Sequence, residues 1–106
     1  MKTYNLCLIG FGNVGRALTL LLQEKETELR DHYGIAWRIT GVATRRMGWL
    51  ADPHGLNVSQ LLAGNIDAWH LPASPTNVGE WLAAAQADVL LEISSLNTQK
   101  IGRAHV

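Results

Sequence analysis

Several features that mark particular classes of protein are missing or scarce in this 106-residue sequence. A single cysteine, Cys7, excludes an internal disulfide and is typical of a reducing compartment. Nine basic residues balance nine acidic ones, so no basic field attracts nucleic acid or an anionic membrane. The apolar stretches are far shorter than the roughly 20 residues of a membrane-spanning helix, and the N-terminus lacks the apolar run of a signal peptide. We therefore expect a cytoplasmic protein with no nucleic-acid or membrane partner.

Residue types that build metal and catalytic sites are present, but not at the spacing that such sites need. The histidines show no metal-ligand spacing with one another or with Cys7: they are His32, His54, His70 and His105. His54 and His70 also lack a nucleophile or a carboxylate at a spacing suited to acid–base catalysis. We therefore assign no metal site and no catalytic residue. The tryptophans are irregularly spaced without a basic stripe, so we interpret them as packing residues rather than a base-stacking platform: Trp37, Trp49, Trp69 and Trp81.

The composition and the order of predicted elements indicate one α/β domain. The sequence is 47% hydrophobic and 17% charged, as in ordinary globular proteins, and its length allows one modest core. Hydrophobic periodicity and turn residues predict strands at 4–9, 36–44 and 89–93, and helices at 13–33, 58–63 and from residue 78 onward. Residues 45–57 are predicted as a loop, and residues 66–71 fit either a strand or an extended connection. This order is typical of a parallel α/β fold.

Side-chain patterns give finer expectations within these elements. Residues at three- and four-residue steps in the long helix are expected to form a buried stripe: Val14, Ala17, Leu18, Leu21, Leu22 and Leu29. Alternation in the second strand is expected to place one set of residues on the same face: Trp37, Ile39, Gly41 and Ala43. Gly34 and Gly64 stand where helices are expected to end. Asn77 and Glu80 resemble a capping box at the start of the last helix, with Val78 and Trp81 among its buried residues.

A glycine motif follows the first predicted strand and opens the first helix. Residues 10–15 have the pattern G-x-G-x-x-G, and a second strand follows about 20 residues later, which is the context that a dinucleotide-binding turn requires. Gly10 permits the tight turn, Gly12 lets a pyrophosphate approach the backbone, and Gly15 lets the helix pack closely on the strand. Free N–H groups at the helix N-terminus then bind the phosphates. The motif and the parallel α/β pattern together predict an incomplete Rossmann-type doubly wound sheet, made of an N-terminal βαβ unit and a following helix and strand.

The end of the second strand bears on the choice of dinucleotide. A carboxylate there favours NAD, whereas arginine accommodates the 2′-phosphate of NADP. This sequence has Thr44, Arg45 and Arg46 at that point, and the first acidic residue after them is Asp52. Guanidinium groups match phosphate oxygens, so we predict a preference for NADPH over NADH. The alternative is that Arg45 and Arg46 are solvated loop residues.

Polar residues also follow the last predicted strand. Ligands of open α/β sheets bind beyond the carboxyl ends of the strands, which would place Ser94, Ser95 and Asn97 near the ribose or nicotinamide half of a dinucleotide. Ordinary turn chemistry explains the same residues equally well, and both interpretations stay open. Glu92 is unusual in an apolar strand and is expected to have a polar partner.

Several separated segments of the sequence resemble bacterial homoserine dehydrogenases. The glycine motif lies within the first of these segments, which are residues 8–18, 33–35, 41–45, 52–56 and 87–92, followed by Ser94, Ser95 and Asn97. The matches occur in the right order and cover residues 4 to about 98. They make the resemblance far more specific than the glycine motif alone.

The resemblance implies an oxidoreductase that reversibly reduces L-aspartate 4-semialdehyde to L-homoserine in threonine and methionine biosynthesis. Hydride would pass between a nicotinamide dinucleotide and the substrate carbonyl carbon. The residues implied to contact the cofactor are Gly10, Phe11, Gly12, Asn13, Val14, Gly15, Thr44, Arg45, Ser94, Ser95 and Asn97. Arg46 joins them from the phosphate argument alone. The expected cofactor is NADP, with NAD possible.

The end of the sequence departs from this resemblance. Members of the family continue into a lysine-bearing segment and then into a substrate and dimerisation domain that carries the catalytic residues, and Lys100 lacks the motif around that lysine. Residues 100–106 correspond to one translated frame of a common sequencing adapter. We therefore expect residues 1–99 to be an NAD(P)-binding Rossmann domain fragment and residues 100–106 to be a non-native tail.

Further expectations follow from such a truncation. The fragment is expected to be inactive, and a homo-oligomer is expected only for the full-length enzyme. One alternative is another NAD(P)-dependent amino-acid or semialdehyde dehydrogenase, which the missing domain would distinguish. The other alternative is a stand-alone nucleotide-sensing module, which would require Val106 to be a genuine C-terminus.

Overall fold

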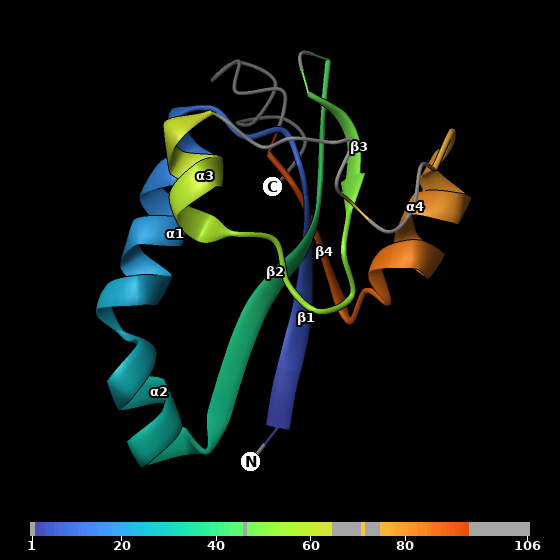
Figure 1. Ribbon diagram of the computed structural model, residues 1–106. Helices are drawn as coiled ribbons and strands as arrows, with labels where there is room; N and C mark the ends of the chain where they lie inside the picture. The colour runs from blue at the N-terminus through green and yellow to red at the C-terminus, as the bar shows by residue number, and fades with distance from the viewer. Residues whose placement is uncertain (1, 46, 65–70, 72–74, 94–106) are drawn as a thin grey trace, which may run out of the picture.

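A mixed sheet organises the part of the chain that the computed structural model describes, which is residues 2–45, 47–64, 71 and 75–93. Its strands stand in the order β3-β2-β1-β4. The elements in chain order are β1 (Lys2–Ile9), α1 (Asn13–Glu24), α2 (Glu26–Tyr33), β2 (Ile35–Thr44), β3 (Gly48–Ala51), α3 (Val58–Ala63), α4 (Val78–Ala85) and β4 (Val89–Glu92). Helices α1, α2 and α3 cover one face of the sheet, and α4 covers the other (Figure 1).

The central strands confirm the predicted parallel α/β pattern. β1 pairs in parallel with β2 on one side and with β4 on the other. Gly34 ends α2 with φ of 66°, and Gly64 ends α3 with φ of 75°, both in the left-handed conformation that glycine adopts without strain. The N-terminal βαβ unit and the following helix and strand are therefore those expected from the sequence.

The prediction of a loop over residues 45–57 is wrong in part, because β3 lies within it. β3 pairs antiparallel with β2, with Gly48 opposite Thr44 and Ala51 opposite Gly41. A tight turn joins the two strands, in which the Thr44 hydroxyl accepts a hydrogen bond from the Met47 N–H at 2.8 Å and Gly48 has φ of 78°. A strand of four residues that begins with glycine has too little periodicity to stand out in a sequence.

The expected alternation along β2 is also wrong, because the strand contains a bulge. Leu6 of β1 pairs with Ile39, but the next residue, Cys7, pairs with Gly41, so Thr40 is an extra residue. The bulge reverses the alternation beyond it. Ile39 therefore packs in the same cluster as Val42, and not on the face of Gly41 and Ala43.

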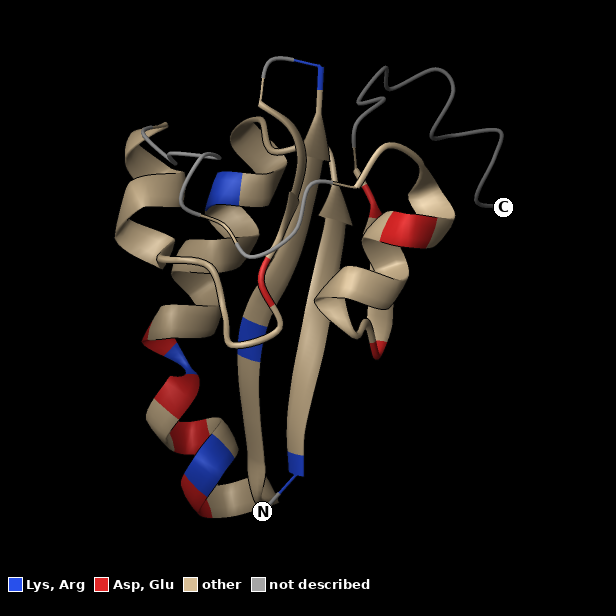
Figure 2. Cartoon of the chain, turned by 45° about the vertical axis from the view of Figure 1, so that its right-hand side comes forward, with Lys and Arg blue, Asp and Glu red and all other residues tan. Residues whose placement is uncertain are grey.

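The helix predicted over residues 13–33 is two helices, and its buried side differs from the expected stripe. The break falls at Lys25, whose ψ of 4° leaves the helical range, and nothing in the local sequence explains it. Gly15 and Thr19 are the buried residues of α1, with Leu18 and Leu22 partly buried beside them. Other members of the predicted stripe are exposed: Val14, Ala17 and Leu21. Charged residues crowd along α2, which buries none of its own side chains (Figure 2).

Two clusters of apolar side chains form the core, one on each face of the sheet. The helices α1 and α3 pack on the first cluster, which contains Leu8, Ile39 and Leu61. Helix α4 packs on the second through Trp81, which is fully buried and donates from Nε1 to the carbonyl oxygen of Leu50 at 2.8 Å. Trp81 therefore ties α4 to β3.

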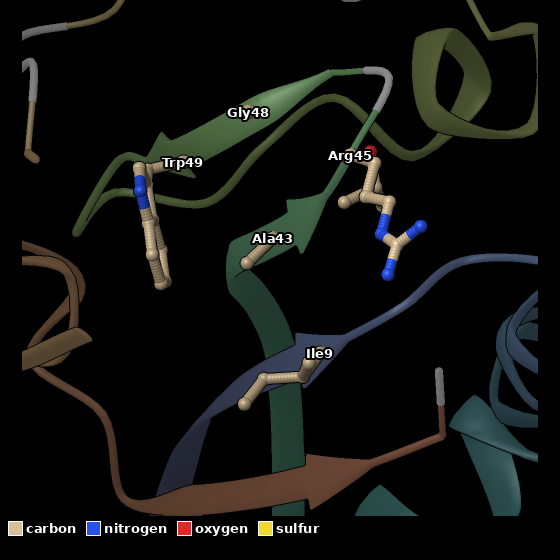
Figure 3. A pocket seen from close by; sticks show the side chains of 6 residues that line it. Ile9, Ala43, Arg45, Gly48 and Trp49 are labelled. Carbon is tan, nitrogen blue, oxygen red and sulfur yellow. The ribbon is translucent and has the colours of Figure 1, made fainter. Parts of the chain in front are cut away.

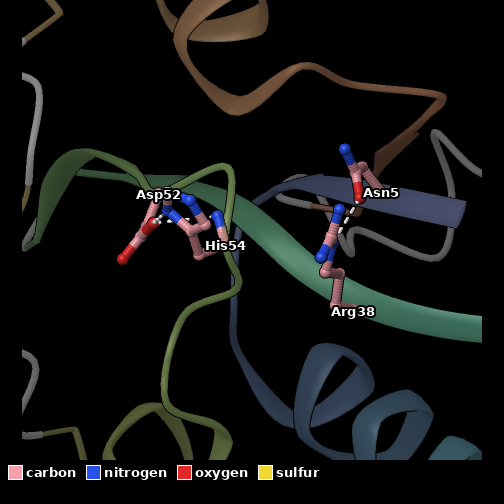
Figure 4. A network of polar contacts seen from close by, with 4 residues as sticks. All are labelled: Asn5, Arg38, Asp52 and His54. Atoms are coloured by element: carbon pink, nitrogen blue, oxygen red, sulfur yellow. Dashed lines mark hydrogen bonds and ion pairs between the residues drawn. The ribbon is translucent and has the colours of Figure 1, made fainter. Parts of the chain in front are cut away.

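Polar contacts on the α4 side hold the amino-terminal half of the sheet together. The buried Asn5 donates from its side chain to the carbonyl of Gln86 at 2.9 Å, and its Oδ1 accepts from Nε of Arg38 at 2.7 Å. A second contact lies nearby in the turn after β3, where the His54 N–H donates to Oδ1 of Asp52 at 2.9 Å (Figure 4). The two bonds of Asn5 link β1 to β2 and to the segment that enters β4, whereas the His54–Asp52 bond is local to its turn.

The capping box predicted at the start of α4 is present in a modified form. Oδ1 of Asn77 accepts from the Glu80 N–H at 2.9 Å, as expected. The Glu80 carboxylate bonds to Thr76 rather than to the backbone of Asn77. Val78, expected to be buried, is 44% exposed, whereas Trp81 and Ala85 are buried.

Glu80 is expected to make the stability of the fold depend on acid pH. Hydrogen bonds from the backbone N–H and then the hydroxyl of Thr76 favour the carboxylate and lower the pKa of Glu80. A carboxyl group whose pKa is lower in the folded state stabilises the fold above its unfolded pKa. That contribution is lost as the pH falls through the lowered pKa. The difference in unfolding free energy between the parent and Glu80→Gln should therefore shrink in acid, which urea titrations at several pH values measure. A difference that does not change with pH would contradict this assignment.

Candidate nucleotide-binding site

The glycine turn joins the carboxyl end of β1 to the amino end of α1. Gly10 follows β1 with φ of 94°, a conformation that strains any residue with a side chain. Its N–H donates to the carbonyl oxygen of Ala43 at 2.7 Å, which fastens the turn to the end of β2. Gly10 thus has the place that the sequence analysis gave it.

Gly12 leaves the N-terminus of α1 open. It caps the helix with φ of −90°, and a Cβ built on it would meet no atom of the described residues within 4 Å. The first hydrogen bond of the helix runs from the Arg16 N–H to the Gly12 carbonyl at 3.0 Å. The N–H groups of residues 13–15 therefore have no carbonyl partner within the helix. An anion can approach them, with the positive end of the helix dipole behind them.

Gly15 is buried for a different reason. A Cβ on Gly15 would lie 3.1 Å from Cδ1 of Ile93 and 3.1 Å from Cδ1 of Phe11. The close approach predicted for this glycine therefore involves two side chains, one from the turn and one after β4. Phe11 is 8% exposed and its side chain belongs to the core, so the ring is packed against the protein.

Arg16 connects the turn to α3. Its guanidinium donates to the carbonyl oxygen of Leu62, near the C-terminus of α3, and lies 5.9 Å from the centre of the Phe11 ring. Arg16 was not among the residues predicted to form the site. These contacts hold α3 and the glycine turn together, and they occupy the guanidinium group of Arg16 with partners inside the protein.

A cavity lies beside the turn, at the carboxyl ends of β1 and β2. It has a volume of about 330 Å³ and is lined by Ile9, Ala43, Thr44, Arg45, Gly48 and Trp49. Figure 3 shows Arg45 on one side of this space and Trp49 on the other. The Thr44 hydroxyl is engaged by Met47, whereas Arg45 is exposed. Thr44 and Arg45 were predicted at this place from the sequence, but Trp49 was not, because β3 was not predicted.

The remaining candidate residues divide into two groups. Asn13 and Val14 are exposed at the first turn of α1, beside Gly12. The others lie outside the described residues: Arg46, Ser94, Ser95 and Asn97. β4 itself ends next to the glycine turn, since Glu92 pairs with Ile9 and the Ile93 N–H donates to the Ile9 carbonyl at 2.9 Å.

The described residues also bear on metal binding, membrane insertion and thiol chemistry. Within the residues that the structure describes, no three histidine, cysteine or acidic side chains gather where a metal ion could be held. None of the described helices is both long and apolar enough to cross a membrane. Burial is the main cause that raises the pKa of the Cys7 thiol, so this residue stays protonated at neutral pH.

The parallel strands and the glycine turn define a partial Rossmann-like fold. Within that class, the chain is similar to homoserine dehydrogenases. An NAD(+)-dependent homoserine dehydrogenase of Pseudomonas canavaninivorans is 36% identical over 61 residues, which are 58% of this chain and 17% of that protein. The chain thus spans less than a fifth of the length of this curated relative. No family model matches the chain.

Solved structures support the same fold. A homoserine dehydrogenase from S. aureus aligns with 89% of this chain and 20% of its own, with a TM-score of 0.58 and 24% identity. A hyperthermophilic archaeal homoserine dehydrogenase mutant in complex with NADPH aligns with 90% of this chain and 30% of its own, with a TM-score of 0.63 and 18% identity. Both sequence and fold thus resemble those of homoserine dehydrogenases.

Proposed function

We propose that this chain is the NAD(P)-binding part of a homoserine dehydrogenase. The observation that carries the proposal is the open backbone at Gly12, next to a cavity bordered by Arg45. The space that a Cβ at residue 12 would fill is the space that a pyrophosphate needs in order to reach the N-terminus of α1. The curated relative is NAD(+)-dependent and one of the solved neighbours holds NADPH, which agrees with a nicotinamide dinucleotide.

The proposed roles of the residues follow from their places. The N–H groups of residues 13–15 bind the pyrophosphate, and Gly10 fixes the turn that presents them. Arg45 contacts the adenosine ribose or its 2′-phosphate from the end of β2. Further contacts to the dinucleotide are proposed from the sequence, and they are Thr44, Arg46, Ser94, Ser95 and Asn97. When bound, the dinucleotide supplies hydride transfer.

We propose the reaction of the whole enzyme from the same resemblance. It is the reversible reduction of L-aspartate 4-semialdehyde to L-homoserine, a step toward threonine and methionine. This chain would contribute cofactor binding through residues 1–99 and no catalytic residue, and so be inactive alone. Residues 100–106 are proposed to be a non-native tail because they correspond to adapter sequence. Resequencing the source DNA from the Ser94 codon onward without adapter ligation tests this, and native codons for the same seven residues would refute it.

The preference for NADPH is tested with Arg45. Arg45→Ala should weaken NADPH binding by about 10- to 100-fold, because a charge-assisted hydrogen bond contributes roughly 1.5–3 kcal/mol. NADH lacks the 2′-phosphate and should lose much less affinity. Titration of both reduced dinucleotides, followed by their fluorescence, measures the two dissociation constants.

A matched control is Arg30→Ala on α2, which removes the same charge far from the turn and should leave both affinities unchanged. Equal affinities of the parent chain for NADPH and NADH, or tighter NADH binding, would overturn the proposed preference. Failure of the folded chain to bind either dinucleotide would overturn the proposed function.

A further inference from the structure

The C-terminus of α3 carries a carbonyl group that the helix does not satisfy by itself. α3 has six residues, and the Gly64 N–H that caps it donates to the carbonyl oxygens of Gln60 and Leu61. The remaining carbonyls at a helix end need partners from outside the helix. Among the described residues, the partner of the Leu62 carbonyl oxygen is Nη1 of Arg16, on the neighbouring α1 (Figure 1). The charge of Arg16 also lies at the negative end of the α3 dipole, which stabilises this contact.

The backbone and the side chain of Arg16 belong to two different parts of the structure. The Arg16 N–H donates to the Gly12 carbonyl at 3.0 Å and so closes the first turn of α1, directly after the N–H groups of residues 13–15. The side chain is half-buried, and its guanidinium lies 5.9 Å from the centre of the Phe11 ring while it bonds to α3. Arg16 is thus adjacent in sequence to the proposed phosphate site, but its charge is already engaged by α3.

The glycine turn is held at two points. On one side, the Gly10 N–H bonds to the Ala43 carbonyl at the end of β2. On the other side, the ring of Phe11 is packed into the core, with the guanidinium of Arg16 beside it. The backbone of residues 12–15 follows Phe11 directly, so the direction of its N–H groups depends on this second point. Through Arg16, that point is connected to the end of α3.

We propose that Arg16 is a positioning residue for the dinucleotide, which fixes the glycine turn against α3 and does not itself contact the pyrophosphate. This rests on the proposed dinucleotide function and makes the C-terminus of α3 part of what determines affinity. A binding site whose backbone is already held in the bound geometry loses less free energy on ordering when the ligand binds. An arginine that turned to the phosphate would instead leave the Leu62 carbonyl without its donor.

The test compares Arg16→Met with Arg30→Met in the full 106-residue chain. Both variants keep a long unbranched side chain and remove one charge, but Arg30 lies on α2, away from the turn. The ligands are NADPH and adenosine 2′-monophosphate, which contains no pyrophosphate. Arg16→Met should bind NADPH about tenfold more weakly, at the lower end of what one hydrogen bond to a charged group contributes. It should bind adenosine 2′-monophosphate as the parent does, and Arg30→Met should bind both ligands as the parent does. Fluorescence titration measures NADPH binding, and NMR titration measures the weaker ligand.

Salt dependence separates a positioning role from a direct contact with phosphate. Salt screens the attraction between a guanidinium and a phosphate, so loss of a direct contact flattens the dependence of the dissociation constant on salt. Arg16→Met should keep the slope of the parent, as Arg30→Met does. Arg45→Ala, which removes a proposed phosphate contact, provides the flattened slope for comparison.

A second variant disturbs the same contact from the side of α3. Gly64 has φ of 75°, so alanine there strains the end of the helix that carries the Leu62 carbonyl. Gly64→Ala should weaken NADPH binding of the parent by about threefold. It should not weaken binding of Arg16→Met any further, because the contact is already lost in that variant. Circular dichroism establishes that each variant is folded.

The remaining outcomes would contradict the positioning role. Affinity of Arg16→Met for NADPH equal to that of the parent, a flattened salt dependence, or additive losses in the double variant would overturn it and leave the proposed function in place. Equal weakening for both ligands would reduce Arg16 to a structural role. If Arg16→Met did not fold, a folded Gly64→Ala with the affinity of the parent for NADPH would overturn the inference. A parent chain that binds neither ligand would remove the proposed function and this inference with it.

Discussion

Replacing Gly12 with valine is expected to abolish measurable dinucleotide binding while the chain stays folded. No atom of the described residues lies within 4 Å of the Cβ position, and φ is negative, so a Cβ at residue 12 meets no neighbour in that part of the chain. The added methyl groups would instead occupy the approach to the N–H groups of residues 13–15. Loss of two charge-assisted hydrogen bonds weakens binding by about 100-fold or more. Isothermal titration with NADPH measures the loss, and thermal unfolding should show little change.

Gly15→Ala is the matched control for Gly12→Val, because it should behave in the opposite way. Its Cβ would lie 3.1 Å from Cδ1 of Ile93 and of Phe11, so these side chains must shift by a few tenths of an ångström, and overpacking of a rigid core costs about 1–3 kcal/mol. Its affinity for NADPH, measured where the variant is folded, should fall far less than that of Gly12→Val. If Gly12→Val bound NADPH as the parent does, the N-terminus of α1 would not be the phosphate site. If Gly12→Val unfolded, the space above Gly12 would not be open.

Replacing Trp81 with alanine is expected to remove a large share of the stability of the fold. Trp81 is fully buried, and truncation of a buried tryptophan costs about 3–5 kcal/mol. The variant also leaves the Leu50 carbonyl without its hydrogen-bond donor. A domain of this length has a total stability of roughly 5–15 kcal/mol, so the loss is a large share of it. Urea denaturation followed by far-ultraviolet circular dichroism measures the change.

The comparison that isolates the role of the ring is Trp81→Phe, which keeps an aromatic side chain but lacks Nε1. Trp81→Phe should lower the free energy of unfolding less than Trp81→Ala does, because phenylalanine leaves a smaller cavity. Both variants lose the hydrogen bond to the Leu50 carbonyl. Gly41 explains why the indole fits, since a Cβ there would lie 2.8 Å from Cys7 Sγ and 3.0 Å from Nε1 of Trp81. A Trp81→Ala variant with the unfolding midpoint of the parent would show that α4 contributes little to the fold.

The parts of the fold that could be predicted are those with a local cause. Gly34, Gly64 and Asn77 end or begin helices through their own backbone or side chain, and each does so in the structure. The bulge at Thr40 has no such cause, because it depends on how β1 and β2 are paired. The bend at Lys25 is likewise not marked by glycine or proline in the sequence.

The same distinction applies to the candidate site. Gly10 and Gly12 could be predicted because a tight turn and an open helix end each need a residue without a side chain at a fixed spacing. Trp49 could not, since its place beside the cavity depends on β3 folding back along β2. The sequence therefore predicts the glycine turn more clearly than the wall of the neighbouring cavity.

The β2–β3 hairpin separates two tasks that a cofactor-binding domain must combine. Arg45 and Trp49 belong to this hairpin at one edge of the sheet, whereas the glycine turn belongs to the central β1–α1 unit. In the proposed site, Arg45 at the end of β2 would distinguish NADPH from NADH, whereas the glycine turn would offer backbone N–H groups to the pyrophosphate that both dinucleotides contain. Only β3 and the end of β2 lie at this edge, so their residues can change in evolution while the pairing of β2 with β1 and of β1 with β4 is kept.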